Sequence, residues 1–500
     1  MRNHILEGAR HSKSMTWRRD LAIVLRRYGF LGFNMDEDGA PISDGLRATN
    51  ASLESPSVSV KACSLIIADR PDIDQLPGVD SRSEEGSGFL YEPGRLWPRP
   101  RKIAYRPLLP HISFSGKDLT PVWTTQCGRT VIGWWNRDGR HHLLVGLRVA
   151  EEMVRYTQGD PSKVVTATDK ALWGFAHERP TYLFTDNIVS GQELVPWADR
   201  LGFTLARLLA QGSEMPLIAP LPDGAAGGVL LTGDDDQAYI EKYDEQVRLL
   251  DGFPITYFML PQTRHTTETL AKMPKSVEFG IHIDALDSPS AYRRVCREQT
   301  LAVRRLIGSP ARAVRNHGHL NDGYWGHLAA WEECGLAFDV NVRGLDGTCP
   351  TGSYLPFRVR RPDGSWSSHV SLFSTFSDGM LYVQKWPQAQ QIACITRLAG
   401  EIELSHPGVL VFNFHPQNVG DFHDVHRAVM ALGRRKGWVA FGAQSYLEWL
   451  SAVDDIRLTC TKKGFELRSP NQVERLGYFW PKRMAGTRLL PKWNGAVSLR

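Results

Sequence analysis

The stretch GVLLTGDDD, residues 228–236, decides the fold of the larger part of the chain. It begins as a short apolar run of buried-strand length and ends in three consecutive acidic residues. It follows the segment Pro220–Gly228 (PLPDGAAGG), whose prolines and glycines cannot hold regular structure. We therefore expect a domain boundary near residue 225 and a new sheet that begins at residue 228.

Similar strand-like runs recur downstream, and helical stretches separate most of them. The expected strands are Gly228–Thr232, Pro254–Leu260, Val277–His282, Ala313–His317, Leu336–Val342, Val409–His415 and Trp438–Phe441. The expected helices include Asp236–Leu250, Ala291–Ile307, His327–Cys334 and Val425–Gly437. Strands that alternate with helices are typical of a (β/α) barrel or an open parallel sheet. We assign this α/β domain to residues 226–451.

Polar and titratable residues close strand after strand of this pattern. They are Asp234 and Asp235 after the first strand, His282 on the third, Arg315 and His317 on the fourth, and His415 on the sixth. In parallel α/β folds the functional groups collect at the carboxyl ends of the strands. We therefore expect these side chains to share one site. Asp339, on the fifth strand, is a candidate for orienting a neighbouring His or Arg.

With these residues in view, the chain resembles the polysaccharide deacetylase (NodB-homology) family, also called carbohydrate esterase family 4. The family's TFDDG-type motif is similar to Thr232–Asp236, its metal-binding His to His282, its Arg to Arg315, and its His-Pro to His415-Pro416. The resemblance covers roughly residues 228–450. It implies a distorted (β/α)7 barrel and a metal-dependent hydrolase that removes acetyl groups from an amino sugar or glycan intermediate.

The resemblance also implies a role for each matched residue. Asp234 would be the general base, held ionised by Arg315, because a nearby cation favours the charged carboxylate. Asp235 and His282 would hold the divalent metal, which activates water and polarises the acyl oxygen. His415 would protonate the leaving amine or alkoxide. Zinc is the first expectation for the metal, with cobalt, nickel and manganese left open.

The chain departs from the family pattern at the second metal-binding His, whose position holds Leu286. Catalytic sites commonly use three protein ligands. We expect His317 to supply the third, with Asp284 and then Asp287 as further choices. The Phe and the final Gly of the family's first motif are Gly233 and Asp236 here.

Two other functions stay open at this point. Leu286 favours a catalytically degenerate barrel that binds a glycan or scaffolds partners without turnover. Alternatively, two carboxylates with an acid could cleave a glycosidic bond. Stoichiometric metal would argue against the first, and sensitivity to a chelator would argue against the second.

The first 225 residues predict a smaller layered α/β domain of unknown role. Leu21–Leu25 and Ala62–Ala68 have the length of buried strands, and a hairpin is expected around Asp138-Gly139. A helix is expected over Arg148–Tyr156. Residues 452–500, with the runs IRLTC and FELRS, predict a short β appendage.

Composition narrows the class of protein. The 500 residues carry 59 Lys and Arg against 54 Asp and Glu, a net charge of +5, too small an imbalance for a nucleic-acid binder. No apolar run approaches the ~20 residues of a membrane span. The start lacks the apolar core of a secretory signal, so a cytoplasmic location is expected. The 7 cysteines form no CxxC pair, which excludes a zinc finger. The expected partner is an acetylated sugar or glycan substrate.

Overall fold

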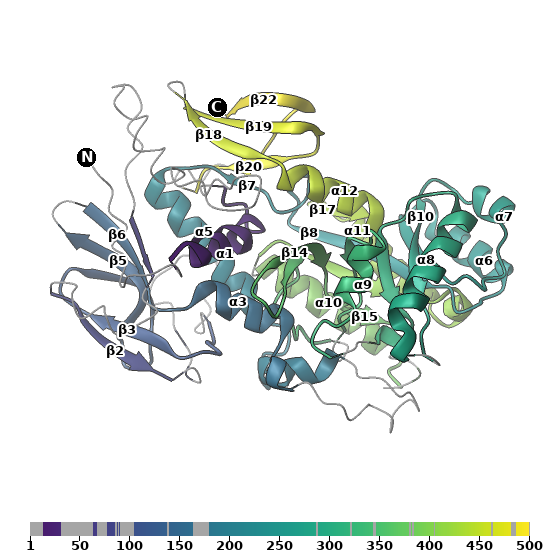
Figure 1. Ribbon diagram of the computed structural model, residues 1–500, viewed down its shortest axis with the longest axis horizontal. Helices are drawn as coiled ribbons and strands as arrows, with labels where there is room; N and C mark the ends of the chain where they lie inside the picture. The colour runs from purple at the N-terminus through teal and green to yellow at the C-terminus, as the bar shows by residue number, and fades with distance from the viewer. Residues whose placement is uncertain are drawn as a thin grey trace. The chain divides into compact units, whose positions relative to one another are not determined.

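The computed structural model (Figure 1) describes residues 14–31, 64–67, 78–85, 88, 90, 105–137, 140–163, 180–286, 289–320, 323–343, 347–379, 382, 385–404, 406–461, 464–481 and 487–499. It divides into two compact units. Unit 1 comprises Met1–Tyr156, Trp197–Gly224 and Ala452–Arg500, and unit 2 comprises Thr157–Pro196 and Ala225–Ser451. That residues 1–225, 226–451 and 452–500 form separate domains stays a prediction.

Unit 2 is built on one mixed sheet of order β13-β14-β12-β11-β10-β9-β8-β16-β15, with β17 also paired to β8. Its parallel strands are β8 (Gly227–Asp234), β9 (Ile255–Met259), β10 (Val277–Ile283), β11 (Ala313–Asn316), β12 (Phe338–Asp339), β14 (Trp366–Ser371), β15 (Phe376–Ser377), β16 (Gly408–Asn413) and β17 (Trp438–Phe441). Strand β13 (Phe357–Arg360) runs antiparallel to β14 at one edge. The sheet is curled, and β13 and β15 form its two edges.

The burial of β8 explains why its sequence is apolar without alternation. All of its residues are buried, because β16 lies along one side and β9 and β17 share the other. Parallel strands covered on both faces read as continuous apolar runs. Strand β8 is therefore the centre of the sheet, and the site grows from its carboxyl end.

Helices connect these strands and cover the sheet (Figure 1). They are α6 (Ile240–Leu250), α7 (Thr267–Ala271), α8 (Tyr292–Ile307), α9 (Leu328–Glu333), α10 (Gln388–Leu404), α11 (His423–Gly433) and α12 (Ala443–Asp454). Helix α8 packs on β10, and α10 and α11 pack on β8. The apolar core lies between these helices and the sheet.

All seven strands expected in this region are confirmed, with ends shifted by a few residues. The list of expected strands was incomplete, because residues 344–378 contain β13, β14 and β15. These strands are short, and β13 and β14 carry Arg, Ser and His as well as apolar residues. Such a mixed composition gives little apolar signal for a strand.

Unit 1 contains several smaller sheets. One has the order β1-β6-β5-β3-β2, with β4 paired to β5, and two others are β18-β19-β22 and β21-β20-β7. The strands are β1 (Ser64–Ile67), β2 (Asp80–Glu84), β3 (His111–Ser115), β4 (Leu119–Thr124), β5 (Thr130–Arg137), β6 (Arg140–Val145), β7 (Leu217–Ile218), β18 (Arg457–Thr461), β19 (Gly464–Val473), β20 (Gly477–Phe479), β21 (Arg488–Leu489) and β22 (Trp493–Leu499). The helices are α1 (Ser14–Arg26), α3 (Val149–Gln158) and α5 (Trp197–Ser213). The smaller layered α/β domain before residue 225 stays a prediction.

The sequence reading of unit 1 holds in part. The hairpin is confirmed as β5 and β6, although its turn at Asp138-Gly139 lies outside the described residues. The strand expected at Leu21–Leu25 is wrong, because these residues belong to α1. Leu21, Ala22 and Leu25 of α1 are buried, and Leu25 follows Leu21 by about one helical turn. A helical period therefore explains the apolar run better than a strand does.

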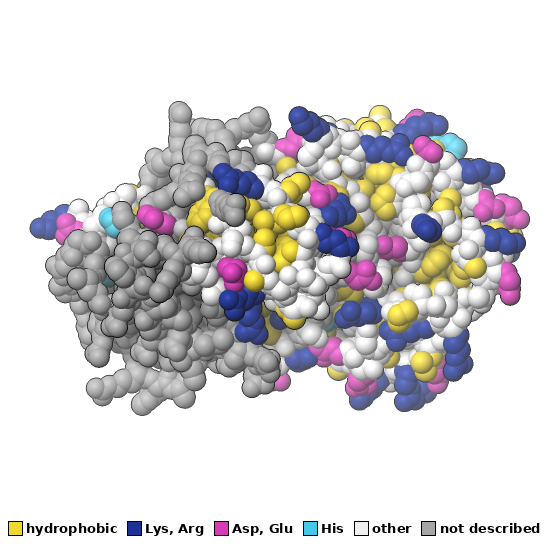
Figure 2. Space-filling model, turned by 90° about the horizontal axis from the view of Figure 1, so that it is seen from above, with side chains coloured by type: hydrophobic (Ala, Val, Ile, Leu, Met, Phe, Trp, Pro, Cys, Tyr) yellow, Lys and Arg dark blue, Asp and Glu magenta, His cyan; other side chains and the backbone are white. Residues whose placement is uncertain are grey.

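The surface that Figure 2 presents carries Lys and Arg side chains interspersed with Asp and Glu. Such a mixture agrees with the small net charge of +5. In the described part of the chain, no helix combines the length and the apolar character needed to cross a membrane.

Candidate metal-dependent active site

The candidate site lies at the carboxyl ends of β8, β10, β11 and β16. The register pairs Thr232 of β8 with Asn413 of β16, and His282 of β10 with Arg315 of β11. Residues that follow these pairs therefore emerge at the same edge of the sheet. The structure brings five of the six predicted site residues into one cluster there, with Asp235 directed elsewhere.

Asp234, at the end of β8, is buried and held by two donors. Arg315 donates from Nη1 to Oδ1 over 2.8 Å, and Asn413 donates from Nδ2 to Oδ2 over 2.9 Å. Burial acts to raise the pKa of Asp234, but the charges of Arg315 and His415 outweigh it and hold that pKa well below its usual range. Asp234 is therefore an ionised, oriented carboxylate.

Arg315 is itself completely buried, an environment that lowers its pKa. Its guanidinium lies 4.7 Å from the ring centroid of Phe258 and donates from Nε to the carbonyl of Val340 over 3.3 Å. A buried guanidinium of this kind requires the charge of Asp234 as its counter-ion. The two residues therefore fix each other.

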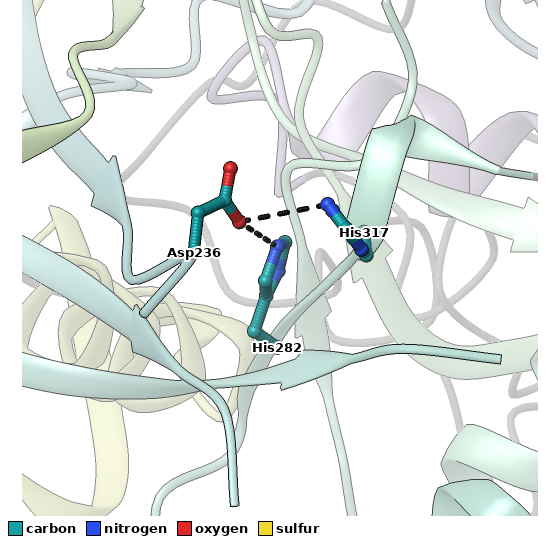
Figure 3. A group of neighbouring side chains, drawn as sticks. All are labelled: Asp236, His282 and His317. Atoms are coloured by element: carbon teal, nitrogen blue, oxygen red, sulfur yellow. Dashed lines mark ion pairs between the residues drawn. The ribbon is translucent and has the colours of Figure 1, made fainter. Parts of the chain in front are cut away.

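Three side chains beside Asp234 converge on one point (Figure 3). The Asp236 Oδ1 atom lies 3.4 Å from Nε2 of His282 and 3.7 Å from Nε2 of His317. One potential ligand atom from each residue lies within 4.8 Å of the others. A carboxylate with two imidazoles is a donor set that zinc and related divalent metals use.

The hydrogen bonding of His282 supports a cation at this point. Its Nδ1 lies 3.1 Å from the carbonyl oxygen of Arg315, which can only accept, so Nδ1 carries the proton. In the neutral ring, Nε2 then directs a lone pair toward Asp236. Both Nε2 of His282 and Oδ1 of Asp236 are buried and lack a hydrogen-bond partner among the described residues. Two facing lone pairs are the arrangement that a metal ion satisfies, so the residues fit the implied metal.

His317, predicted from the sequence as the third ligand, is the third member of this group, and Asp284 stands behind it. Oδ2 of Asp284 lies 3.3 Å from Nδ1 of His317, the nitrogen opposite the one that faces Asp236. Metal-binding histidines commonly have a carboxylate in this place. Asp284 is therefore placed to orient His317, and Asp287 lies outside the described residues.

The backbone explains why Asp236 can reach the histidines. Asp236 and Gln237 both have positive φ, 40° and 58°, a conformation that non-glycine residues rarely adopt. The family motif has glycine at the position of Asp236, so the chain keeps a glycine-like turn and adds a carboxylate to it. At Gly233, an added Cβ would lie 2.8 Å from the carbonyl oxygen of Phe414, so only glycine fits there.

Asp235, predicted as a metal ligand, is directed away from the cluster, and Asp236 is the carboxylate that faces His282 and His317. The Asp235 carboxylate accepts hydrogen bonds from the hydroxyls of Tyr243 and Thr263 and from the amide of Leu260. Successive residues that follow a strand point to opposite sides, so Asp235 faces the interior while its two neighbours face the site. Burial raises its pKa. Asp235 therefore anchors the loops behind the site.

His415 stands opposite the three possible ligands. Nδ1 donates to Oδ1 of Asp378 over 2.7 Å, and the backbone amide of His415 donates to Oδ2 of Asp378 over 2.7 Å. Nε2 lies 3.4 Å from Oδ2 of Asp236 and 3.7 Å from Oδ2 of Asp234. Burial acts to lower the pKa of His415, but the surrounding carboxylates, above all Asp378, raise it to about 10. His415 therefore presents a proton at Nε2.

Sequence reasoning missed Asp378 and Asn413 as site residues. Asn413 lies near the end of an expected strand, so its position could have identified it as a site residue. Asp378 lies where neither a strand nor a helix was expected, so it carried no such signal. Asp339 does orient a histidine, but that histidine is His369: the two side chains meet at 2.9 Å and are both completely buried.

No protein-family model and no curated protein matches the chain. Among solved structures, a protein described as a polysaccharide deacetylase of Mycobacterium smegmatis is 19% identical, with a TM-score of 0.38, and the match covers 48% of this chain and 96% of that one. One from Bordetella bronchiseptica, linked by its description to O-antigen biosynthesis, is 18% identical, with a TM-score of 0.31, over 46% and 91%. An allantoinase is 14% identical, with a TM-score of 0.37, over 48% and 94%.

Structures of the family that the motifs resemble are thus among those similar to this chain. All three TM-scores are below 0.5, and the allantoinase shows that matches of this strength extend to a different activity. We therefore take neither substrate nor mechanism from them, and rest the functional proposal on the residues of the site.

Proposed function

We propose that this protein is a metal-dependent hydrolase that removes an acetyl group from an amino sugar or a related glycan intermediate. The observation that carries the proposal is the meeting of the Asp236, His282 and His317 ligand atoms beside the ionised Asp234 and the protonated His415. We further propose that the curled sheet of unit 2 is a distorted (β/α)7 barrel.

Asp236, His282 and His317 would hold a divalent ion, with zinc as the first expectation. Such an ion supplies Lewis-acid polarisation of a carbonyl and lowers the pKa of water. Asp234 would accept the proton of the attacking water, since Arg315 and Asn413 keep its carboxylate ionised and oriented. His415 would donate its Nε2 proton to the leaving amine or alkoxide. Asp378 would keep that nitrogen directed toward the reacting atoms.

Metal content and acetate release from acetylated amino sugars, measured on the purified full chain, test the proposal. We expect about one divalent ion per chain and loss of activity on chelation. Asp236→Asn should weaken metal binding by at least about tenfold, because it removes a direct ligand. Asp235→Asn, a matched change one residue away, should leave the metal content unaltered. Equal metal loss in both variants would contradict the assignment of Asp236.

A second variant tests the base. Asp234→Asn should retain the metal and lower acetate release by about 10²–10⁴-fold, the range for general acid–base catalysis. Full activity in this variant would overturn the role of Asp234. A protein that binds glycans without stoichiometric metal would indicate a carbohydrate-binding module. Cleavage of a glycosidic bond that resists chelation would indicate a glycosidase.

A further inference from the structure

Tyr382 is exposed at the border of the site, yet its hydroxyl is held in place. The residue is 52% exposed, one of four large apolar or aromatic side chains that are prominently exposed in the described ranges. Its hydroxyl lies 3.1 Å from Oδ1 of Asn418 and 3.1 Å from Oδ2 of Asp421. One end of the ring is therefore fixed by polar contacts while much of the ring remains open to a ligand.

A chain of hydrogen bonds links this hydroxyl to His415. Asn418 donates from Nδ2 to Oδ2 of Asp378 over 2.9 Å, and Oδ1 of Asp378 accepts the Nδ1 proton of His415 over 2.7 Å. Because the amide nitrogen of Asn418 serves Asp378, its oxygen must face Tyr382. Two side chains therefore separate the tyrosine hydroxyl from the imidazole.

We propose that Tyr382 is a sugar-contacting and positioning residue of the proposed reaction. The ring packs against the apolar face of the sugar that carries the acyl group, and the hydroxyl, through Asn418 and Asp378, holds His415 toward the reacting atoms. A tyrosine ring suits the first role, because it offers a large amphipathic surface with few rotatable bonds. The inference rests on the proposed function and adds a determinant of sugar binding to it.

Two substitutions separate the ring from the hydroxyl. Tyr382→Phe keeps the ring and removes the link to Asn418, so kcat for acetate release should fall about tenfold while KM changes little, the pattern of an interaction made only in the transition state. Tyr382→Ala removes both, so KM should also rise about tenfold. A KM effect in Tyr382→Phe with unchanged kcat would contradict the positioning role.

Two measurements without turnover keep this inference separate from the proposed activity. In histidine-labelled full-length protein, Tyr382→Phe should speed the solvent exchange of the His415 Nδ1 proton about tenfold, as observed by NMR, because Asp378 loses its support. In the Asp234→Asn background, calorimetry with the tetramer of N-acetylglucosamine should show about tenfold weaker binding after Tyr382→Ala. If only acetate release failed, the proposed function would be overturned. The proton exchange and the tetramer binding would then still decide the roles of Tyr382.

Tyr239→Phe is the matched control, since Tyr239 is 61% exposed and its hydroxyl has no hydrogen bond among the described residues. It should leave kcat, proton exchange and sugar binding unaltered. Unchanged His415 exchange in Tyr382→Phe would overturn the positioning role. Equal tetramer binding with and without the ring, or no tetramer binding before the ring is removed, would overturn the sugar contact.

Discussion

Two buried carboxyl groups, one in each unit, are driven in opposite directions by their surroundings. Asp234 of unit 2 is paired with Arg315, and its pKa lies well below the usual range despite burial. Glu152, on α3 of unit 1, is also completely buried. Its oxygens accept from the amides of Leu108 and Leu109 and from the hydroxyl of Tyr105, and burial raises its pKa to about 7.

The difference shows that hydrogen-bond donors alone do not bring the pKa of a buried carboxyl below its usual range. Asp235 supports this point, since it accepts from hydroxyls and an amide, as Glu152 does, and burial raises its pKa as well. Only Asp234, of these three, has a guanidinium on its carboxylate. A full positive charge in direct contact therefore makes a buried acid into a base that can act at neutral pH.

Removing that charge should have the largest effect. Arg315→Met keeps much of the side-chain volume but leaves Asp234 buried without a counter-ion. We expect the free energy of unfolding of unit 2 to fall by about 3–5 kcal/mol, the usual cost of breaking a buried pair. Hydrogen exchange of the β8 and β11 amides would measure it. Acetate release should fall at least about 100-fold, because Asp234 becomes protonated.

The double variant Asp234→Asn/Arg315→Met sharpens this test. Because it removes both charges, it should recover much of the lost stability while activity stays low. Arg294→Met is a suitable control, since Arg294 is exposed and pairs on the surface with Glu298. Such surface pairs contribute about 0–1 kcal/mol. Equal destabilisation by Arg294→Met and Arg315→Met would break the comparison.

The raised pKa of Glu152 predicts that the stability of unit 1 depends on pH. The folded state keeps its proton up to about pH 7, whereas the unfolded chain releases it near the ordinary glutamate pKa of 4.5. The unfolded state therefore binds fewer protons in this window, so stability falls as the pH rises. The loss amounts to about 3 kcal/mol over the window. Glu152→Gln should remove this slope.

Hydrogen exchange of the α3 amides between pH 4.5 and 7 would measure the effect, as the difference between the original protein and Glu152→Gln, after correction for the intrinsic rate. Glu151→Gln is the control, because Glu151 is exposed beside it on the same helix. A slope that survives in Glu152→Gln would mean that Glu152 is ionised when buried, as Asp234 is.

The sequence predicts the sheet of unit 2 well because buried strands have a recognisable apolar composition. Fully buried strands such as β8 and β16 must be apolar, and the polar residues that follow them stand out. The short strands β13 and β14 mix polar and apolar residues, so their composition does not distinguish them from loops. Leu21–Leu25 shows the related limit that a short apolar run does not by itself distinguish a helix from a strand.

The site shows a different limit. The choice between Asp235 and Asp236 depends on the positive φ values of Asp236 and Gln237 after β8. Neither residue is a glycine, so the sequence does not indicate this backbone conformation. Asp378 meets His415 only because β15 and β16 are neighbours in the sheet. A pairing across 37 residues has no local signal. The polar residues at predicted strand ends are therefore enough to locate such a site. The role of each residue depends on the backbone conformation after the strand and on which strands are neighbours, and these come from the structure.

The smallest effect concerns the hydroxyls that surround Asp235. Tyr243 donates to the buried carboxylate of Asp235, whereas Tyr257 donates to the neutral amide oxygen of Gln246 over 2.8 Å. Both rings are completely buried, so Tyr243→Phe and Tyr257→Phe remove the same atom from similar surroundings. Hydrogen bonds to charged groups contribute about 1.5–3 kcal/mol and those to neutral groups about 1 kcal/mol. Urea unfolding should therefore show a larger loss for Tyr243→Phe. Equal losses would mean that Asp235 is protonated in the folded state, as Glu152 is at low pH, and that Asp234 is the only carboxylate of the three that stays charged.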